Sequence, residues 1–232
     1  MGLSRERKRL SPYGAARRHF NVGVAALLGA AAMALSGAAM AANGPIRLLA
    51  LGDSLTAGYG LGEGQGFVPQ LEKALRAKGY DVTVINAGVS GDTTAGGLSR
   101  LDWALGDKPD AALVALGAND MLRGLDPAAA RANLDAILTR LKERNIPTLL
   151  AGMYASASYG RAYTQRFDAI YPELAARHGV PLYPFFLDGV ATDAALNQGD
   201  GIHPNAAGVK VIVERILPHV TRLLDNRLRT GG

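Results

Sequence analysis

Nucleophilic catalysis by a serine requires a hydroxyl, a base and an acid, and the sequence offers Ser54, His203 and Asp200. Ser54 follows the short apolar run 46–51, which suits a buried strand, and Gly52 ends that run just before it. His203 lies in an irregular segment, with Asp200 three residues upstream. This spacing lets the carboxylate turn back to the nearer imidazole nitrogen, so that the farther nitrogen can take a proton from a serine.

Acyl transfer also needs hydrogen-bond donors for the oxygen that becomes negatively charged. Gly91 follows a second predicted strand, 81–86, and Asn119 follows a third, 111–116. The N–H groups of these residues and of Ser54 are candidate donors. Each residue also has an ordinary structural role, because serine caps helices while glycine and asparagine are common in turns. Taken singly, none of them decides between the two roles.

The remaining candidates for site chemistry are few. The chain has no cysteine, which excludes disulfides and thiolate catalysis. His178 precedes the helix-stopping Gly179, and His219 lies within the last predicted helix, so neither is a candidate base. No H-E-x-x-H pattern, phosphate loop or G-x-G-x-x-G fingerprint is present. We therefore expect neither a metal nor a cofactor.

Five predicted strands alternate with amphipathic helices, and the connections are short. This order is typical of a doubly wound, mostly parallel α/β sheet, in which ligands bind at the carboxyl ends of the strands. We expect the loops that carry the candidate residues to meet at that edge. The predicted strands are 46–51, 81–86, 111–116, 148–152 and 181–183, and the predicted helices are 67–78, 95–105, 127–144, 161–178 and 205–227.

Residues 1–41 have the order of a secretory signal peptide. Basic side chains are followed by the apolar stretch 22–35 and by Ala39-Met40-Ala41, which predicts cleavage after Ala41. The alternative is a membrane anchor, for which the apolar stretch is short. Arg17-Arg18 resembles part of a twin-arginine signal, so that route and the general secretory route both stay open. The predicted location is periplasmic or secreted, with no stable membrane insertion after cleavage.

The charge of the chain is concentrated in this leader. Residues 1–41 hold six of the 25 Lys and Arg and one of the 20 Asp and Glu, so residues 42–232 hold 19 of each. The basic balance of the whole chain therefore gives no reason to expect a nucleic-acid partner. Because no linker interrupts the pattern, we expect a single domain over 42–228 and a frayed tail at 229–232. The sequence does not indicate an oligomeric state.

Four short blocks resemble the GDSL, or SGNH, hydrolase family, and they occur in the order found in that family. The resemblance covers about residues 46–224 and implies a three-layer α/β/α sandwich with a flavodoxin-like, five-stranded parallel sheet. It implies Ser54 as nucleophile, His203 as base and Asp200 as its orienting acid, with oxyanion donors at Gly91 and Asn119. The blocks are Gly52-Asp53-Ser54-Leu55, Ser90-Gly91-Asp92-Thr93, Gly117-x-Asn119-Asp120 and Asp200-x-x-His203-Pro204.

Further matches resemble the periplasmic multifunctional group of this family, which contains arylesterases, acyl-thioesterases and lysophospholipases. These matches are the segment 52–59, Leu122-Arg123-Gly124, Tyr159-Gly160-Arg161 and the segment 200–205. The implied substrate is a small acyl ester or thioester, cleaved through an acyl-enzyme on Ser54.

Two alternatives remain open at this point. One is an O-acetyl carbohydrate esterase, and the other, from a different class, is a non-catalytic flavodoxin-like module that binds a small ligand. Tyrosines at 154, 159 and 163 suit an acyl groove, stacking on sugars or simple packing, and packing is the ordinary role.

Overall fold

The computed structural model describes Met1 and residues 44–230. The predicted signal peptide and its cleavage site fall on residues 2–43, and these lie outside the described residues, as do 231–232. Residues from Pro45 onward form one compact unit, and the description below concerns that unit.

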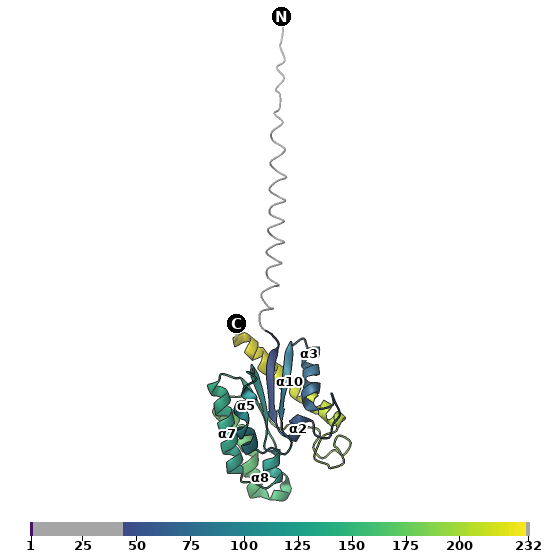
Figure 1. Ribbon diagram of the computed structural model, residues 1–232, viewed down its shortest axis with the longest axis vertical. Coiled ribbons are helices and arrows are strands. Elements are labelled where there is room, and N and C mark those ends of the chain that lie inside the picture. Colours follow the sequence, from purple (N-terminus) through teal and green to yellow (C-terminus); the bar gives the residue numbers. More distant parts are fainter. Residues whose placement is uncertain (2–43, 231–232) are drawn as a thin grey trace. The chain divides into compact units, whose positions relative to one another are not determined.

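A five-stranded parallel sheet forms the centre of the unit, in the order β2-β1-β3-β4-β5 (Figure 1). The predicted α/β class and flavodoxin-like strand order are therefore confirmed. The inner strand β3 is buried along its whole length, as expected for a parallel strand covered on both faces. The strands are β1 (Ile46–Gly52), β2 (Val82–Gly88), β3 (Ala111–Ala115), β4 (Thr148–Ala151) and β5 (Leu182–Tyr183).

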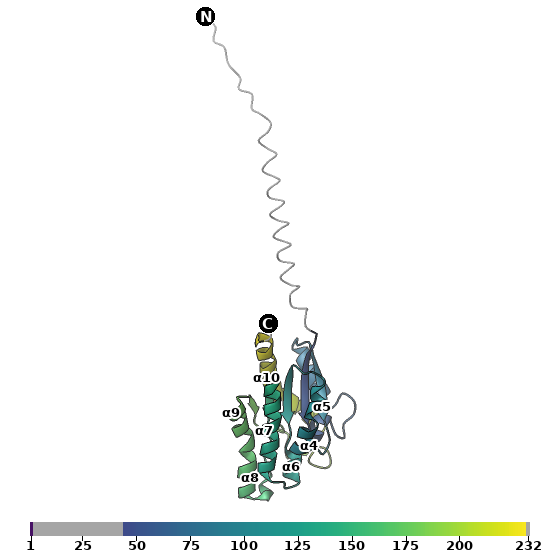
Figure 2. The same ribbon diagram turned by 60° about the vertical axis from the view of Figure 1, so that its left-hand side comes forward.

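Helices cover both faces of the sheet, which gives the predicted three layers (Figures 1 and 2). One layer holds α3 (Phe67–Ala77) and α10 (Ala206–Thr230), which pack against each other. The opposite layer contains α4 (Thr94–Ser99), α5 (Leu101–Leu105), α7 (Pro127–Glu143), α8 (Arg161–Asp168) and α9 (Ile170–His178). Although α10 is 25 residues long, no helix between residues 44 and 230 combines the length and apolar character needed to cross a membrane.

Two predicted helices are divided in the structure. The helix expected over 161–178 breaks at Ala169, because Pro172 has no N–H to donate to the preceding turn. The helix expected over 95–105 breaks at Arg100, which ends α4 and begins α5.

The last helix is longer than predicted, because α10 continues to Thr230. Arg229 and Thr230, expected to belong to a frayed tail, are therefore helical.

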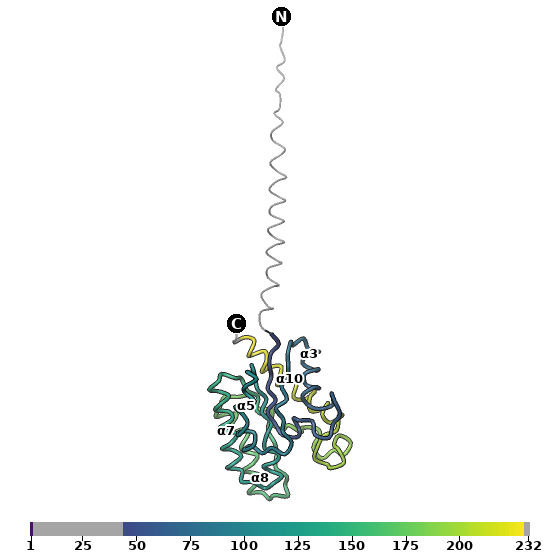
Figure 3. The backbone as a smooth tube through the Cα atoms, in the orientation of Figure 1, coloured from purple at the N-terminus to yellow at the C-terminus, as the bar shows by residue number. Residues whose placement is uncertain are grey.

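Three short elements at strand ends were not predicted: α2 (Ser54–Ala57), α6 (Ala118–Leu122) and the 3₁₀ turn η2 (Ala157–Tyr159). Two of them, α2 and α6, begin within three residues of the ends of β1 and β3. Figure 3 shows the loops that follow the strands gathered at the lower end of the unit, together with the yellow-green segment 184–204.

Close packing against β2 fixes the position of α2. A Cβ atom added to Gly88, the last residue of β2, would lie 2.3 Å from the backbone nitrogen of Ala57 and 2.9 Å from the carbonyl oxygen of Asp53. Only a residue without a side chain allows this approach. The glycine therefore lets the segment around Ser54 lie directly on the end of the neighbouring strand.

Gly88→Ala should destabilise the protein by about 1–3 kcal/mol, because the added methyl group must push α2 away from β2. Urea unfolding of the purified protein measures the change. Gly44→Ala is the control, since nothing lies within 4 Å of the corresponding Cβ position. Equal unfolding midpoints for the Gly88 and Gly44 variants would contradict this account of the packing.

Candidate active site

Ser54 is held at the first turn of a short helix that starts where β1 ends. The carboxylate of Asp53 caps this helix by accepting the N–H of Leu55 at 3.0 Å. Asp53 is buried, whereas Ser54 is partly exposed and lines a cleft. The helix cap is therefore Asp53 rather than Ser54, and the serine hydroxyl is left available for other contacts.

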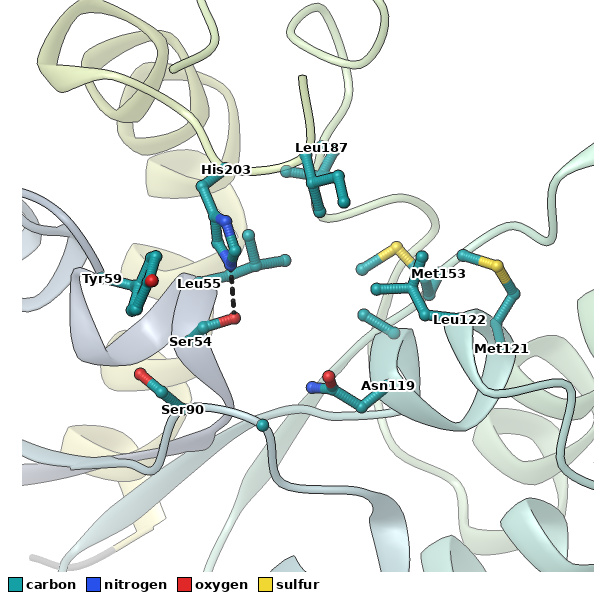
Figure 4. Close-up of a pocket in the computed structure, with 13 residues that line it drawn as sticks. Ser54, Leu55, Tyr59, Ser90, Asn119, Met121, Leu122, Met153, Leu187 and His203 are labelled. Atoms are coloured by element: carbon teal, nitrogen blue, oxygen red, sulfur yellow. Dashed lines mark hydrogen bonds between the residues drawn. The ribbon is translucent and has the colours of Figure 1, made fainter. Parts of the chain in front are cut away.

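His203 and Asp200 reach Ser54 from the other end of the chain (Figure 4). The Nε2 atom of His203 lies 3.0 Å from the Oγ atom of Ser54. The Nδ1 atom of the same ring lies 2.7 Å from Oδ2 of Asp200. When Nδ1 donates its proton to that carboxylate, Nε2 is the acceptor that faces the serine hydroxyl. The three residues singled out in the sequence thus form one hydrogen-bonded chain.

Asp200 is anchored as an anion by its own loop. Its Oδ1 atom accepts the backbone N–H groups of Ile202 and His203 at 2.9 and 3.0 Å. These bonds, led by those from His203, hold the pKa of Asp200 well below its usual range. The carboxylate therefore keeps its charge through the mildly acidic range, so it orients the imidazole over a broad span of pH.

The loop that carries His203 is tied to the end of α2. The side-chain amide of Gln198 donates to the carbonyl oxygens of Tyr59 and Pro204. The backbone N–H of Gln198 donates to the carbonyl oxygen of His203 at 2.7 Å. The ring of Tyr59 also packs against the imidazole, with centroids 4.6 Å apart. These contacts fix the imidazole relative to the serine. Gln198 was not singled out in the sequence, and Tyr59 belonged to a family match without an assigned role.

The predicted oxyanion donors lie on the other side of Ser54. Gly91 has φ = +84°, a conformation that favours glycine. Among the described residues, neither the N–H of Gly91 nor that of Ser54 has a hydrogen-bond acceptor. The Nδ2 atom of Asn119 donates one proton to the carbonyl oxygen of Asp92 at 2.9 Å, and Figure 4 shows this nitrogen turned toward Ser54. Unpaired N–H groups beside a nucleophile are what a developing oxyanion requires.

The other two histidines of the folded part serve structural contacts. His178 lies 2.6 Å from the carboxylate of Asp135, and the ring of His219 packs against Tyr183 at 5.0 Å. Neither lines the cleft, in agreement with the sequence interpretation.

The tyrosines considered for an acyl groove, Tyr154, Tyr159 and Tyr163, do not line the cleft either. The rings of Tyr159 and Tyr163 pack against each other at a tilt, and their hydroxyls donate to the carbonyl oxygens of Leu122 and Leu125. Tyr154 packs against Phe185. Packing, one of the three roles considered for these residues, is therefore the role they have.

A cleft of about 220 Å³ opens beside Ser54 and His203. Figure 4 shows that its wall opposite the serine consists of apolar side chains. The sequence interpretation missed this wall, because one or two apolar residues in each of three separate segments form no pattern. Its members are Met121, Leu122, Met153 and Leu187, and Ile202 adds an apolar edge beside His203. No group of three or more His, Cys, Asp or Glu side chains within residues 44–230 could hold a metal ion.

Comparison with known proteins identifies the family. Residues 50–211 match the model of the GDSL-like Lipase/Acylhydrolase family. Two curated relatives are similar over most of their length. "Esterase TesA" of Pseudomonas aeruginosa is 40% identical, covering 76% of this chain and 89% of the relative. "Thioesterase 1/protease 1/lysophospholipase L1" of Escherichia coli K12 is 43% identical, covering 77% and 85%.

The chain belongs to the GDSL-like lipase/acylhydrolase family. It is accordingly an enzyme of the ester hydrolase class. A solved structure agrees: AlinE4, described as an SGNH-hydrolase family esterase, is 49% identical with a TM-score of 0.67, covering 78% of this chain and 98% of that one. The resemblance inferred from the four sequence blocks is thereby confirmed.

One carboxyl group of the GDSL block has an unusual proton affinity. Burial raises the pKa of Asp53 to about 6, although the hydrogen bond from Leu55 N–H opposes this shift. In the unfolded chain an Asp releases its proton near pH 4. Between about pH 4 and 6, the folded state therefore holds a proton on Asp53 that the unfolded state has lost. The resulting contribution to stability is fully present below about pH 4 and is lost as the pH rises to about 6.

Asp53→Asn should remove this pH dependence, because the amide keeps an oxygen acceptor for Leu55 N–H and does not ionise. Between pH 4 and 7, the wild type should lose about 2 kcal/mol of unfolding free energy relative to the variant. Urea unfolding at pH 4, 5, 6 and 7 measures the difference. The exposed carboxylate of Asp81, replaced by Asn, is the control. A stability difference that is the same at every pH would contradict the expected ionisation of Asp53.

Proposed function

We propose that this enzyme hydrolyses carboxylic esters and thioesters through a covalent acyl-enzyme on Ser54. The observation that carries the proposal is the hydrogen-bonded chain from Ser54 Oγ through the His203 imidazole to Asp200. His203 Nε2 takes the hydroxyl proton while Oγ attacks the acyl carbon, and Asp200 holds the imidazole in the required tautomer.

The reaction then proceeds in two displacements. The tetrahedral intermediate collapses, the bond to the leaving group breaks, and His203 gives its proton to the departing alcohol or thiol. A water molecule next attacks the acyl-enzyme, and the same imidazole removes its proton. The second collapse releases the carboxylic acid and restores the Ser54 hydroxyl. Both tetrahedral intermediates carry a negative oxygen, which the N–H groups of Ser54, Gly91 and Asn119 stabilise.

The apolar wall of the cleft favours acyl groups longer than acetyl. Met121, Leu122, Met153 and Leu187 offer an alkyl or aryl chain a surface to cover, whereas recognition of a sugar needs convergent polar groups. The printed names of the two curated relatives, "Esterase TesA" and "Thioesterase 1/protease 1/lysophospholipase L1", support esters and thioesters as substrates. This reading is favoured over an O-acetyl carbohydrate esterase.

We further propose that the enzyme works in the periplasm or outside the cell. Residues 1–41 have the basic, apolar and A-x-A regions of an export signal, in that order. Cleavage after Ala41 would leave one catalytic domain that starts at residue 42 and ends with α10.

The test is turnover of p-nitrophenyl esters of increasing acyl length by purified protein. Ser54→Ala should lower kcat by about 10⁴-fold or more, because no other group replaces the nucleophile. Butyrate and longer esters should give a higher kcat/KM than acetate, since the apolar wall contacts only the longer chains.

Ser90→Ala is the matched control for this variant, because it removes a second serine hydroxyl from the same cleft. It should keep most of the activity, as the imidazole of His203 bonds to Ser54 instead. Equal rates for the wild type and Ser54→Ala would overturn the proposed mechanism, and activity on acetyl esters alone would overturn the proposed substrate class.

A further inference from the structure

Arg100 lies behind the candidate active site, at the junction of α4 and α5. Its side chain is only 17% exposed and does not line the cleft. The guanidinium makes two hydrogen bonds in different directions. Its Nε atom donates to Oδ2 of Asp92 at 2.5 Å, and its Nη2 atom donates to the carbonyl oxygen of Gly52 at 2.8 Å.

Both partners of Arg100 are neighbours of the expected oxyanion donors. Gly52 is two residues before Ser54, and its carbonyl oxygen accepts both the Arg100 guanidinium and, at 3.1 Å, the backbone N–H of Val89. Asp92 directly follows Gly91. The same guanidinium therefore joins the two backbone segments that carry the N–H groups of Ser54 and Gly91.

The third donor is connected through the same partner. The carbonyl oxygen of Asp92 accepts one proton of the Asn119 amide at 2.9 Å, which leaves the other proton for the cleft. Arg100 holds the carboxylate of Asp92, whose backbone carbonyl accepts the Asn119 amide. Arg100 is thus linked to all three donors without touching any of them, while Gly91 is also held by Arg123, which donates to its carbonyl oxygen at 2.6 Å.

A guanidinium suits this position because its N–H groups form a rigid planar fork. A lysine ammonium at the same place could bind either the Asp92 carboxylate or the Gly52 carbonyl, but it has no rigid fork to hold both at a fixed relative orientation. The Nη1 atom is buried and has no partner among the described residues, although buried nitrogens are normally paired. The two hydrogen bonds to Gly52 and Asp92 therefore set the orientation of the guanidinium.

We propose that Arg100 is a positioning residue that sets the geometry of the oxyanion donors of Ser54, Gly91 and Asn119. This inference rests on the proposed acyl-transfer function. Its action is indirect, through the Gly52 carbonyl and the Asp92 carboxylate. The expected consequence of its loss is a poorly aligned oxyanion site with an intact nucleophile, base and substrate cleft.

Arg100→Lys should lower kcat by about 10²-fold and change KM by less than about threefold, because small misplacements affect the transition state far more than substrate binding. The inhibition constant of a trifluoromethyl ketone, which forms a tetrahedral adduct with an active serine, should rise by the same factor as kcat/KM falls. Arg144→Lys is the matched control, since Arg144 pairs with Asp102 at the surface and contacts neither Gly52 nor Asp92.

A double variant separates this role from general support of the fold. If Arg100 acts through the donors, Asn119→Ala should cost less activity in the Arg100→Lys background than in the wild type. Thermal unfolding confirms that each variant is folded at the assay temperature. If Arg100→Lys does not fold, Asp92→Asn provides the same comparison, because it keeps an oxygen for Arg100 but removes the charge.

The outcomes distinguish this inference from the proposed function. If Ser54→Ala abolishes turnover while folded Arg100→Lys keeps kcat and the inhibition constant within about threefold of the wild type, the role of Arg100 is wrong and the acyl-transfer mechanism stands. Strictly multiplicative losses in the double variant would also overturn it. If Ser54→Ala is as active as the wild type, the proposed function itself fails.

Discussion

The hydrogen bond between Ser54 and His203 is the contact on which the rest of the site depends. It joins two residues that are 149 positions apart in the chain, at a distance of 3.0 Å. Such a contact forms only if β1 and the segment before α10 end at the same edge of one sheet. The parallel strand order and the packing of α3 on α10 bring these ends together, and the loop bonds of Gln198 then fix the imidazole. The fold thus brings the imidazole of a distant histidine within hydrogen-bond distance of a serine.

The two aspartates beside this contact differ in burial, and their pKa values shift in opposite directions. Asp53, next to the serine, is buried with one strong donor, so its pKa rises to about 6. Asp200, next to the imidazole, lies in an exposed loop with several donors, so its pKa falls far below its usual range. Two aspartates of the family blocks thus have opposite electrostatic environments. One shapes the turn that presents the serine, and the other supplies the charge that orients the base.

Much of the fold and of the site could be predicted from the sequence, because short continuous stretches of residues carry the patterns in both cases. Apolar or β-branched runs, most of them closed by a nearby glycine, indicated the strands, and the blocks around Ser54, Gly91, Asn119 and His203 indicated the polar site. The apolar wall and the bonds of Arg100 could not be predicted, since both depend on side chains from separate segments that meet only after folding. Short helices such as α2 were also missed, because four residues are too few to show a helical period.

A crystal structure of the protein after reaction with an alkyl phosphonate ester tests the central claim most directly. Such a reagent mimics the tetrahedral intermediate and reacts with a serine that an imidazole activates. We predict phosphorus bonded to the Oγ atom of Ser54, with one phosphonyl oxygen within about 3 Å of the nitrogen atoms of Ser54, Gly91 and the Asn119 amide. The alkyl chain should lie along the apolar wall. Failure to react, reaction at another residue, or an oxygen turned away from these three donors would contradict the account.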